Sequence, residues 1–157
     1  MTVHDMRLEH TIEISASAQA LYDMVADVAR MGEWSPENIG GTWVDGALGR
    51  VGDRFDGRNR IGDYEWTVTC EVTAAEPGEV FEWVAGAGVD GGPFVRWTYR
   101  FAGAEDGSTV VTETYDVEVL PPALASRTPD QLEQRKAQVS VAMQATLAAL
   151  KEAAEAS

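Results

Sequence analysis

The amino-acid sequence predicts an α+β fold, in which a curved antiparallel β-sheet wraps around a long C-terminal α-helix and two short helices follow the first strand. Three observations lead to this prediction. A strand pattern stands near the N-terminus, about six alternating segments fill residues 42–119, and the last quarter of the chain changes to helical spacing. The 157 residues fit a single domain spanning residues 1–157.

The first strand is predicted over residues 6–14, because apolar and polar residues alternate there. Its more apolar face carries Met6, Leu8, His10, Ile12 and Ile14. Ser15 and Ser17 are candidate N-caps for a short helix that is interrupted near Asp27 and ends around Gly32. Residues 34–41 are expected to form a loop, since a proline and paired glycines interrupt both patterns.

A β-meander is predicted from Thr42 to Val119, where short alternating segments are separated by turn signals. These signals are Gly62-Asp63, Pro77-Gly78, a glycine-rich loop over residues 86–92, and Asp106-Gly107. The alternation places seven aromatic rings on one face of the sheet: Trp66, Phe81, Trp83, Trp97, Tyr99, Phe101 and Tyr115.

One long helix is predicted from Thr128 to about Ala154. Thr128, Pro129 and Gln131 supply an N-cap, a proline at the first helical position and a capping-box residue. The apolar face then carries Leu132, Val139, Met143, Leu147 and Leu150. The helix would be about 39 Å long, enough to cover the sheet. Large rings beneath it can hold helix and strands apart, so an internal apolar cavity is expected.

The composition excludes several classes of function. Twelve Lys and Arg against 26 Asp and Glu give a net charge of −14, which argues against binding nucleic acid or anionic membranes. No segment approaches the ~20 apolar residues that a membrane span needs, so a cytoplasmic protein without membrane insertion is expected. The single cysteine argues against a thiolate metal site. Gly86–Gly91 matches GxGxxG but precedes a strand, not the helix that a dinucleotide-binding loop requires, so no cofactor is predicted. No metal is predicted either.

Three segments resemble a known superfamily: WSPEN at residues 34–38, GDRFDGRNRIGDYEW at residues 52–66 and AAEPGEVFEW at residues 74–83. Together with the order of elements, they make the chain similar, from Leu8 to Ala154, to the START-like SRPBCC superfamily, and within it to the polyketide cyclase/dehydrase and lipid transport group. The resemblance implies a helix-grip fold with a hydrophobic cavity. Its members include lipid carriers and aromatase/cyclases, so it implies a class of ligand and no particular reaction.

The residues expected to bind the ligand lie on the predicted inner face or near the cavity mouth. They are Trp34, Asn59, Trp66, Phe81, Trp83, Trp97, Tyr99, Glu113, Tyr115, Met143 and Leu147.

Several of these candidates have a structural alternative. His10 could act as an acid or base or be a hydrogen-bonded core histidine. Glu113 could be a cavity acid with a raised pKa, or a bulge could turn it to solvent. Asn59 could bind a carbonyl or satisfy backbone near Gly57. Trp34 could cover the cavity or plug the small helix against the sheet, and Cys70 is expected to be an inert buried thiol.

Two functions remain open from the sequence, with an interaction protein as a third, less supported hypothesis. The first is binding of a hydrophobic or aromatic, lipid- or polyketide-like small molecule by a monomer or homodimer. The alternative is a polyketide cyclase, aromatase or dehydratase, with His10, Glu113, Tyr115 and Asn59 as the acting groups. The charge of −14 favours a neutral or cationic ligand over an anionic one.

Overall fold

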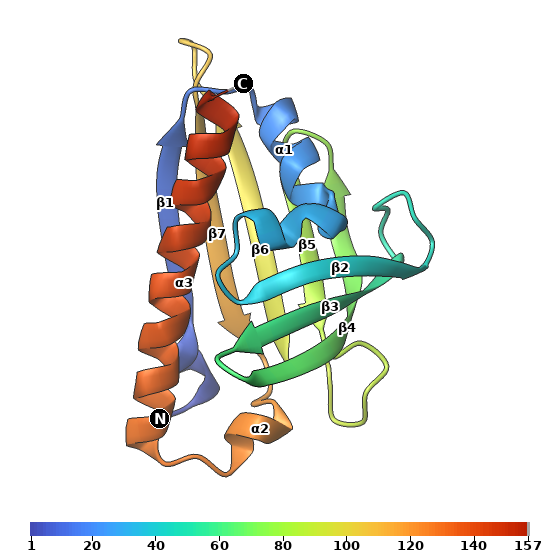
Figure 1. Ribbon diagram of the computed structural model, residues 1–157, viewed down its shortest axis with the longest axis vertical. Coiled ribbons are helices and arrows are strands. Elements are labelled where there is room, and N and C mark those ends of the chain that lie inside the picture. Colours follow the sequence, from blue (N-terminus) through green and yellow to red (C-terminus); the bar gives the residue numbers. More distant parts are fainter. Residues whose placement is uncertain (157) are drawn as a thin grey trace.

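The computed structural model describes residues 1–156 and is built on one seven-stranded sheet (Figure 1). The order of strands is β1-β7-β6-β5-β4-β3-β2, and every neighbouring pair is antiparallel. The strands are β1 (Leu8–Ile14), β2 (Asn38–Asp45), β3 (Arg54–Ile61), β4 (Tyr64–Glu76), β5 (Val80–Ala85), β6 (Val95–Gly103) and β7 (Thr109–Val117). The β-meander and the α+β fold are therefore confirmed.

Helices stand on one side of this sheet. They are the 3-10 helices η1 (Val3–Met6) and η2 (Val28–Glu33) and the α-helices α1 (Ala18–Ala26), α2 (Pro122–Ala125) and α3 (Pro129–Glu155). Asp27 ends α1 and begins η2, so the predicted interruption of the first helix is confirmed. The sequence analysis did not predict η1 or α2, whose single turns are too short to show a helical period.

The predicted caps form as expected. The Ser17 hydroxyl accepts a hydrogen bond from the Ala20 amide at 3.1 Å. At the start of α3 the Gln131 amide donates to the Thr128 hydroxyl at 3.2 Å, and the Thr128 amide donates to the Gln131 side chain at 3.0 Å. The reciprocal pair satisfies two amides that the first turn would leave free.

Three predicted boundaries were wrong. β1 begins at Leu8, because Val3–Met6 coil into η1. β7 ends at Val117, which leaves Val119 exposed. The largest difference is β2, which begins at Asn38 inside the expected loop. A register shift between Asn38 and Gly40 lets the strand continue, and Gly40 takes a positive φ of 138° at this bulge.

Two apolar clusters hold the helices against the sheet. In the first, Leu147 and Leu150 of α3 pack with α1 and with the strand residues beneath it. In the second, Val139 and Met143 pack with η1, with the neighbouring ends of β6 and β7, and with Leu124 of α2. Helix α3 runs along β1, at the edge of the curved sheet (Figure 1).

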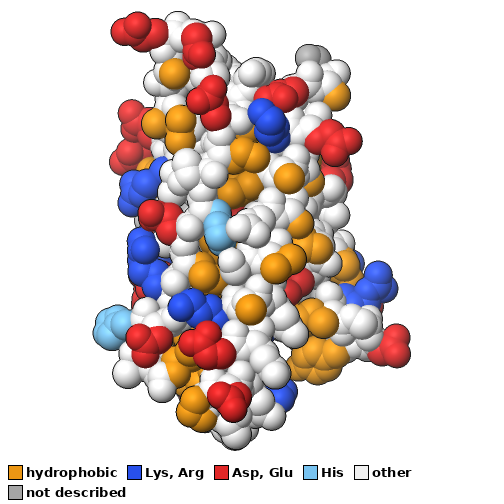
Figure 2. Space-filling view, turned by 90° about the vertical axis from the view of Figure 1, so that its left-hand side faces the viewer, with side chains coloured by type: hydrophobic (Ala, Val, Ile, Leu, Met, Phe, Trp, Pro, Cys, Tyr) orange, Lys and Arg blue, Asp and Glu red, His pale blue; other side chains and the backbone are white. Residues whose placement is uncertain are grey.

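The surface is predominantly acidic, in line with the net charge of −14. Figure 2 shows acidic side chains scattered over the face that carries α3 and β1, with hydrophobic patches between them. Among the helices that the structure describes, none is long and apolar enough to cross a membrane.

We expect Leu150→Ala to lower the free energy of unfolding by about 2–5 kcal/mol, because it leaves a cavity where α3 meets the first cluster. Leu150 is 1% exposed, whereas Val141 on the outer face of the same helix is 65% exposed. Val141→Ala is the matched control and should change stability by less than about 0.5 kcal/mol. Urea unfolding of both variants measures the difference, and equal effects would contradict the described seat of α3.

Candidate functional site

A chamber of about 920 Å³ lies between the concave face of the sheet and the helices. Strands β3 to β7 form its floor, η2 and α2 contribute to its rim, and residues 131–146 of α3 form one wall. A volume of this size is typical of sites that enclose small organic molecules.

Aromatic rings from several elements line this chamber. They are Trp34, Phe55, Tyr64, Trp66, Trp83, Phe94, Trp97, Tyr99 and Tyr115. The rings of Trp83 and Trp97 stack with centroids 6.5 Å apart, and Trp83 stacks on Tyr99 at 5.9 Å. The ring of Trp97 lies 4.9 Å from that of Tyr115. These contacts form a continuous aromatic surface across β5, β6 and β7.

Two of the seven predicted inner rings lie elsewhere. Phe81 and Phe101 are buried under α1, where their rings meet Tyr22 at 5.8 and 5.9 Å. Leu147 likewise packs in the first cluster and does not line the chamber, whereas Met143 does. The alternation assigned these side chains to the correct face, but it could not show which part of that face the small helix covers.

Glu113 is the most unusual group in the chamber. The carboxyl is 3% exposed, so the hypothesis that a bulge turns it to solvent is wrong. Register places Glu113 of β7 between His10 on β1 and Tyr99 on β6. The Tyr99 hydroxyl donates a hydrogen bond of 2.7 Å to Oε2 of Glu113. The other oxygen, Oε1, is buried without a hydrogen-bond partner among the described residues.

Burial governs the protonation of this pair. It raises the pKa of Glu113 to about 8, although the hydrogen bond from Tyr99 acts in the opposite direction. Burial also raises the pKa of Tyr99 well above its usual range, and the neighbouring carboxyl adds to that effect. At neutral pH the pair is therefore a phenol donating to a carboxylic acid.

The other candidate polar groups are placed differently. His10 does not line the chamber; its Nε2 lies 2.8 Å from the Ser140 hydroxyl of α3, so it joins β1 to that helix. Asn59 does line the chamber, and its amide nitrogen also donates to the Gly57 carbonyl at 3.4 Å. Tyr115 lines the chamber two residues from Glu113, and burial raises the pKa of its hydroxyl to about 12.

Trp34 and Cys70 also contribute to the wall. Trp34 ends η2, is buried, and lies beneath the Arg30 guanidinium, 4.9 Å from its ring centroid. It therefore both packs η2 against the sheet and borders the chamber. Burial raises the pKa of the Cys70 thiol to about 12, so this side chain acts as an apolar part of the wall.

An ion pair that the sequence analysis missed joins two sides of the chamber. The two terminal guanidinium nitrogens of Arg135 on α3, Nη1 and Nη2, donate to the Glu37 carboxylate at 2.8 and 2.9 Å. Both residues line the chamber and are mostly buried, with side chains 20% and 23% exposed. Arg135 follows Leu132 by three residues and precedes Val139 by four, which already placed it on the apolar face of α3. Nothing in the sequence indicated its partner.

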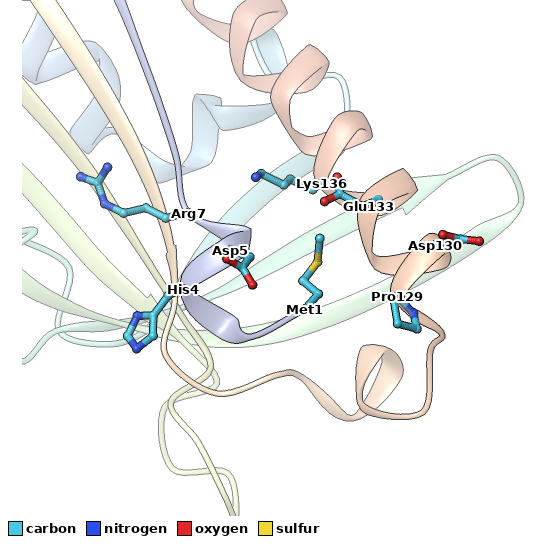
Figure 3. A pocket seen from close by; sticks show the side chains of 8 residues that line it. All are labelled: Met1, His4, Asp5, Arg7, Pro129, Asp130, Glu133 and Lys136. Carbon is cyan, nitrogen blue, oxygen red and sulfur yellow. The ribbon is translucent and has the colours of Figure 1, made fainter.

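A second hollow of about 500 Å³ lies between η1 and the first turns of α3 (Figure 3). Its charged residues carry both signs, and Figure 3 shows Arg7 and His4 pointing away from α3. These features indicate a solvated surface groove. Among the described residues, no group of three or more His, Cys, Asp or Glu is placed to hold a metal ion.

The raised pKa of Glu113 predicts a pH-dependent cost to stability. In the unfolded chain the carboxyl ionises near its ordinary value of 4.5, whereas in the folded protein it ionises near 8. Stability is therefore lost as the pH rises between these values and is lowest above the folded pKa. Glu113→Gln removes this pH-dependent cost, so its stability relative to the parent protein should rise by on the order of 5 kcal/mol across that range.

Urea unfolding at a series of pH values measures this difference between variant and parent. Glu105→Gln, in the exposed β6–β7 turn, is the control and should show no such trend. A difference between Glu113→Gln and the parent that stays constant with pH would contradict the protonation assigned to the buried acid.

Comparison with known proteins identifies relatives of this chain. The chain is 30% identical over 112 residues to the uncharacterized protein Rv0088 of Mycobacterium tuberculosis, a match that spans 70% of this chain and 47% of that protein. The structure is similar to that of the Polyketide_cyc-like protein Cgl2372 from Corynebacterium glutamicum, with 28% identity, a TM-score of 0.68, and coverage of 96% of this chain and 91% of that one.

The Zhui aromatase/cyclase from Streptomyces sp. R1128 also has this fold. It is 19% identical with a TM-score of 0.74, over 95% of this chain and 93% of that one. The family model described as polyketide cyclase/dehydrase and lipid transport matches residues 5–155, which is nearly the whole chain. The family resemblance is thereby confirmed: the chain belongs to the polyketide cyclase/dehydrase and lipid transport family.

Proposed function

We propose that this protein binds an apolar small molecule with an aromatic or lipid-like body in the chamber beneath α3. The observation that carries the proposal is a volume of about 920 Å³ walled by aromatic rings from five strands and η2. Flat rings offer contact area to an apolar ligand without many rotatable bonds to order. Family membership supports the same class of ligand.

The charge distribution favours an uncharged ligand. The chain carries a net charge of −14, which disfavours the approach of anions. The cation lining the chamber near Glu37, Arg135, is neutralised by two short hydrogen bonds to that carboxylate. The other cation that lines the chamber, Arg127, is exposed, and its Nε donates to the Ala123 carbonyl. A fatty or aromatic carboxylate buried beneath α3 would therefore have no unpaired buried cation among the described lining residues as its partner.

A second candidate is a polyketide cyclase, aromatase or dehydratase. It is favoured by the presence of Glu113, Tyr115 and Asn59 on the wall of one chamber, and by the likeness to an aromatase/cyclase. Such a reaction requires proton transfer to a bound carbonyl compound, for which Glu113 would be the acid. His10 is a weaker candidate than the sequence suggested, because it bonds Ser140 outside the chamber.

Native mass spectrometry of the freshly purified protein tests the first proposal. We expect a bound species of a few hundred daltons, since the chamber would accommodate a molecule of that size. The same molecule recovered unchanged after prolonged incubation would favour binding, whereas conversion to a product that has lost water would favour the second candidate. An unliganded protein that also fails to bind any aromatic probe would contradict both.

Filling the chamber should abolish binding without unfolding the protein. Ala142 of α3 lines the chamber, whereas Ala145 on the same helix is exposed. We expect Ala142→Phe to weaken binding of an aromatic probe at least about tenfold, because its ring takes the ligand's place, and Ala145→Phe to leave affinity unchanged. Quenching of tryptophan fluorescence measures both, and thermal unfolding checks the fold. Equal affinities for the two variants would place the probe outside the chamber.

A further inference from the structure

The unpaired oxygen of Glu113 is a polar group for which the described residues supply no partner. Oε1 is buried without a hydrogen bond to any of them, while Oε2 accepts from Tyr99 at 2.7 Å. Leaving a buried polar atom unpaired is unfavourable, because the atom loses its hydrogen bonds to water and gains none in return. Because Glu113 also lines the chamber, a ligand in that chamber is the group positioned to remove this cost.

The Tyr99 hydrogen bond decides which oxygen carries the proton. The phenol acts as donor, so Oε2 is occupied as an acceptor and the acid proton of a neutral Glu113 belongs on Oε1. Oε1–H is then a donor in a water-poor, aromatic wall. A ligand atom that satisfies it must be an acceptor, and a carbonyl oxygen is the uncharged acceptor best suited to a single strong donor.

Among the described residues that flank Glu113, no unpaired charge provides an alternative partner for this acid. On the adjacent strands the cross-strand neighbours are His10, bonded to Ser140, and Tyr99 itself. On α3 the wall residues 139, 142, 143 and 146 are uncharged, and Arg135 is held by Glu37. Arg127 also lines the chamber, but it is exposed and donates to the Ala123 carbonyl, so a neutral Glu113 is consistent with these surroundings.

We infer that the chamber selects an uncharged ligand with a carbonyl oxygen, which accepts a hydrogen bond from the Oε1–H of Glu113 while Tyr99 holds the carboxyl in place. This inference rests on the proposed function and names the polar end of the ligand. Glu113 and Tyr99 have different roles: Glu113 touches the ligand, and Tyr99 is a positioning residue. An ionised Glu113 would repel the same carbonyl, so affinity should fall as the pH rises past about 8.

Three probes of matched shape test this inference: naphthyl methyl ketone, ethylnaphthalene and naphthoate. Tryptophan quenching and calorimetry give their dissociation constants at about pH 6 and about pH 9.5, on either side of the pKa. We expect the ketone to bind about tenfold more tightly than the hydrocarbon at the lower pH and to lose most of that advantage at the higher pH. Naphthoate should bind most weakly at both.

Variants separate the hydrogen bond from mere packing. Glu113→Gln keeps an N–H donor and cannot ionise, so it should bind the ketone at both pH values without a pH trend. Glu113→Leu should bind ketone and hydrocarbon equally well. Tyr99→Phe should keep the preference for the ketone but shift the pH at which it is lost, because the carboxyl loses its hydrogen bond.

Each outcome bears on a different claim. Equal binding of ketone and hydrocarbon by the parent protein at the lower pH would overturn the inference and leave the proposed function intact. A pH trend that persists in Glu113→Gln would also overturn it, since another group would then be titrating. Failure of all three probes to bind would contradict the proposed function and, with it, the inference.

Discussion

The shape of the molecule around its chamber follows from how α3 packs along its length. Leu147 and Leu150 fix the C-terminal half in the cluster beneath α1, and Val139 and Met143 fix the middle against η1 and the ends of β6 and β7. A 27-residue helix fixed at these residues is too stiff to bend further onto the sheet. The space between α3 and strands β3 to β7 is lined largely by aromatic rings and stays open as a chamber.

This arrangement also explains the polar chemistry of the site. The wall is built from side chains that bury well, so the few polar groups within it feel a strongly desolvating environment. Glu37 and Arg135 offset the cost of this desolvation by forming an ion pair with each other. Glu113 forms no ion pair among the described residues; it accepts a hydrogen bond from the Tyr99 phenol, and burial raises its pKa so that it stays protonated at neutral pH. The result is an uncharged interior in a protein whose surface is strongly acidic.

Most of the fold could be predicted from the sequence, because the patterns that specify its elements are local. Alternation, turn pairs and the capping box at Thr128 specify strands, hairpins and the start of α3 without knowledge of tertiary contacts. The prediction failed where tertiary contacts determine the structure. The examples are the bulge that lets β2 begin at Asn38 and the packing of Tyr22 of α1 over Phe81 and Phe101. The Arg135–Glu37 pair joins residues far apart in the chain, and no spacing rule could match them.

We have proposed that the space between α3 and the aromatic floor takes up a ligand. Nuclear Overhauser effects between a bound naphthyl methyl ketone and the protein would locate that ligand. We expect contacts from the ligand to the rings of Trp83, Trp97 and Tyr115 and to the Met143 methyl, all of which line the chamber. Contacts confined to Tyr64, which is 61% exposed at the tip of the β3–β4 hairpin, would contradict it, since the ligand would then lie on the surface.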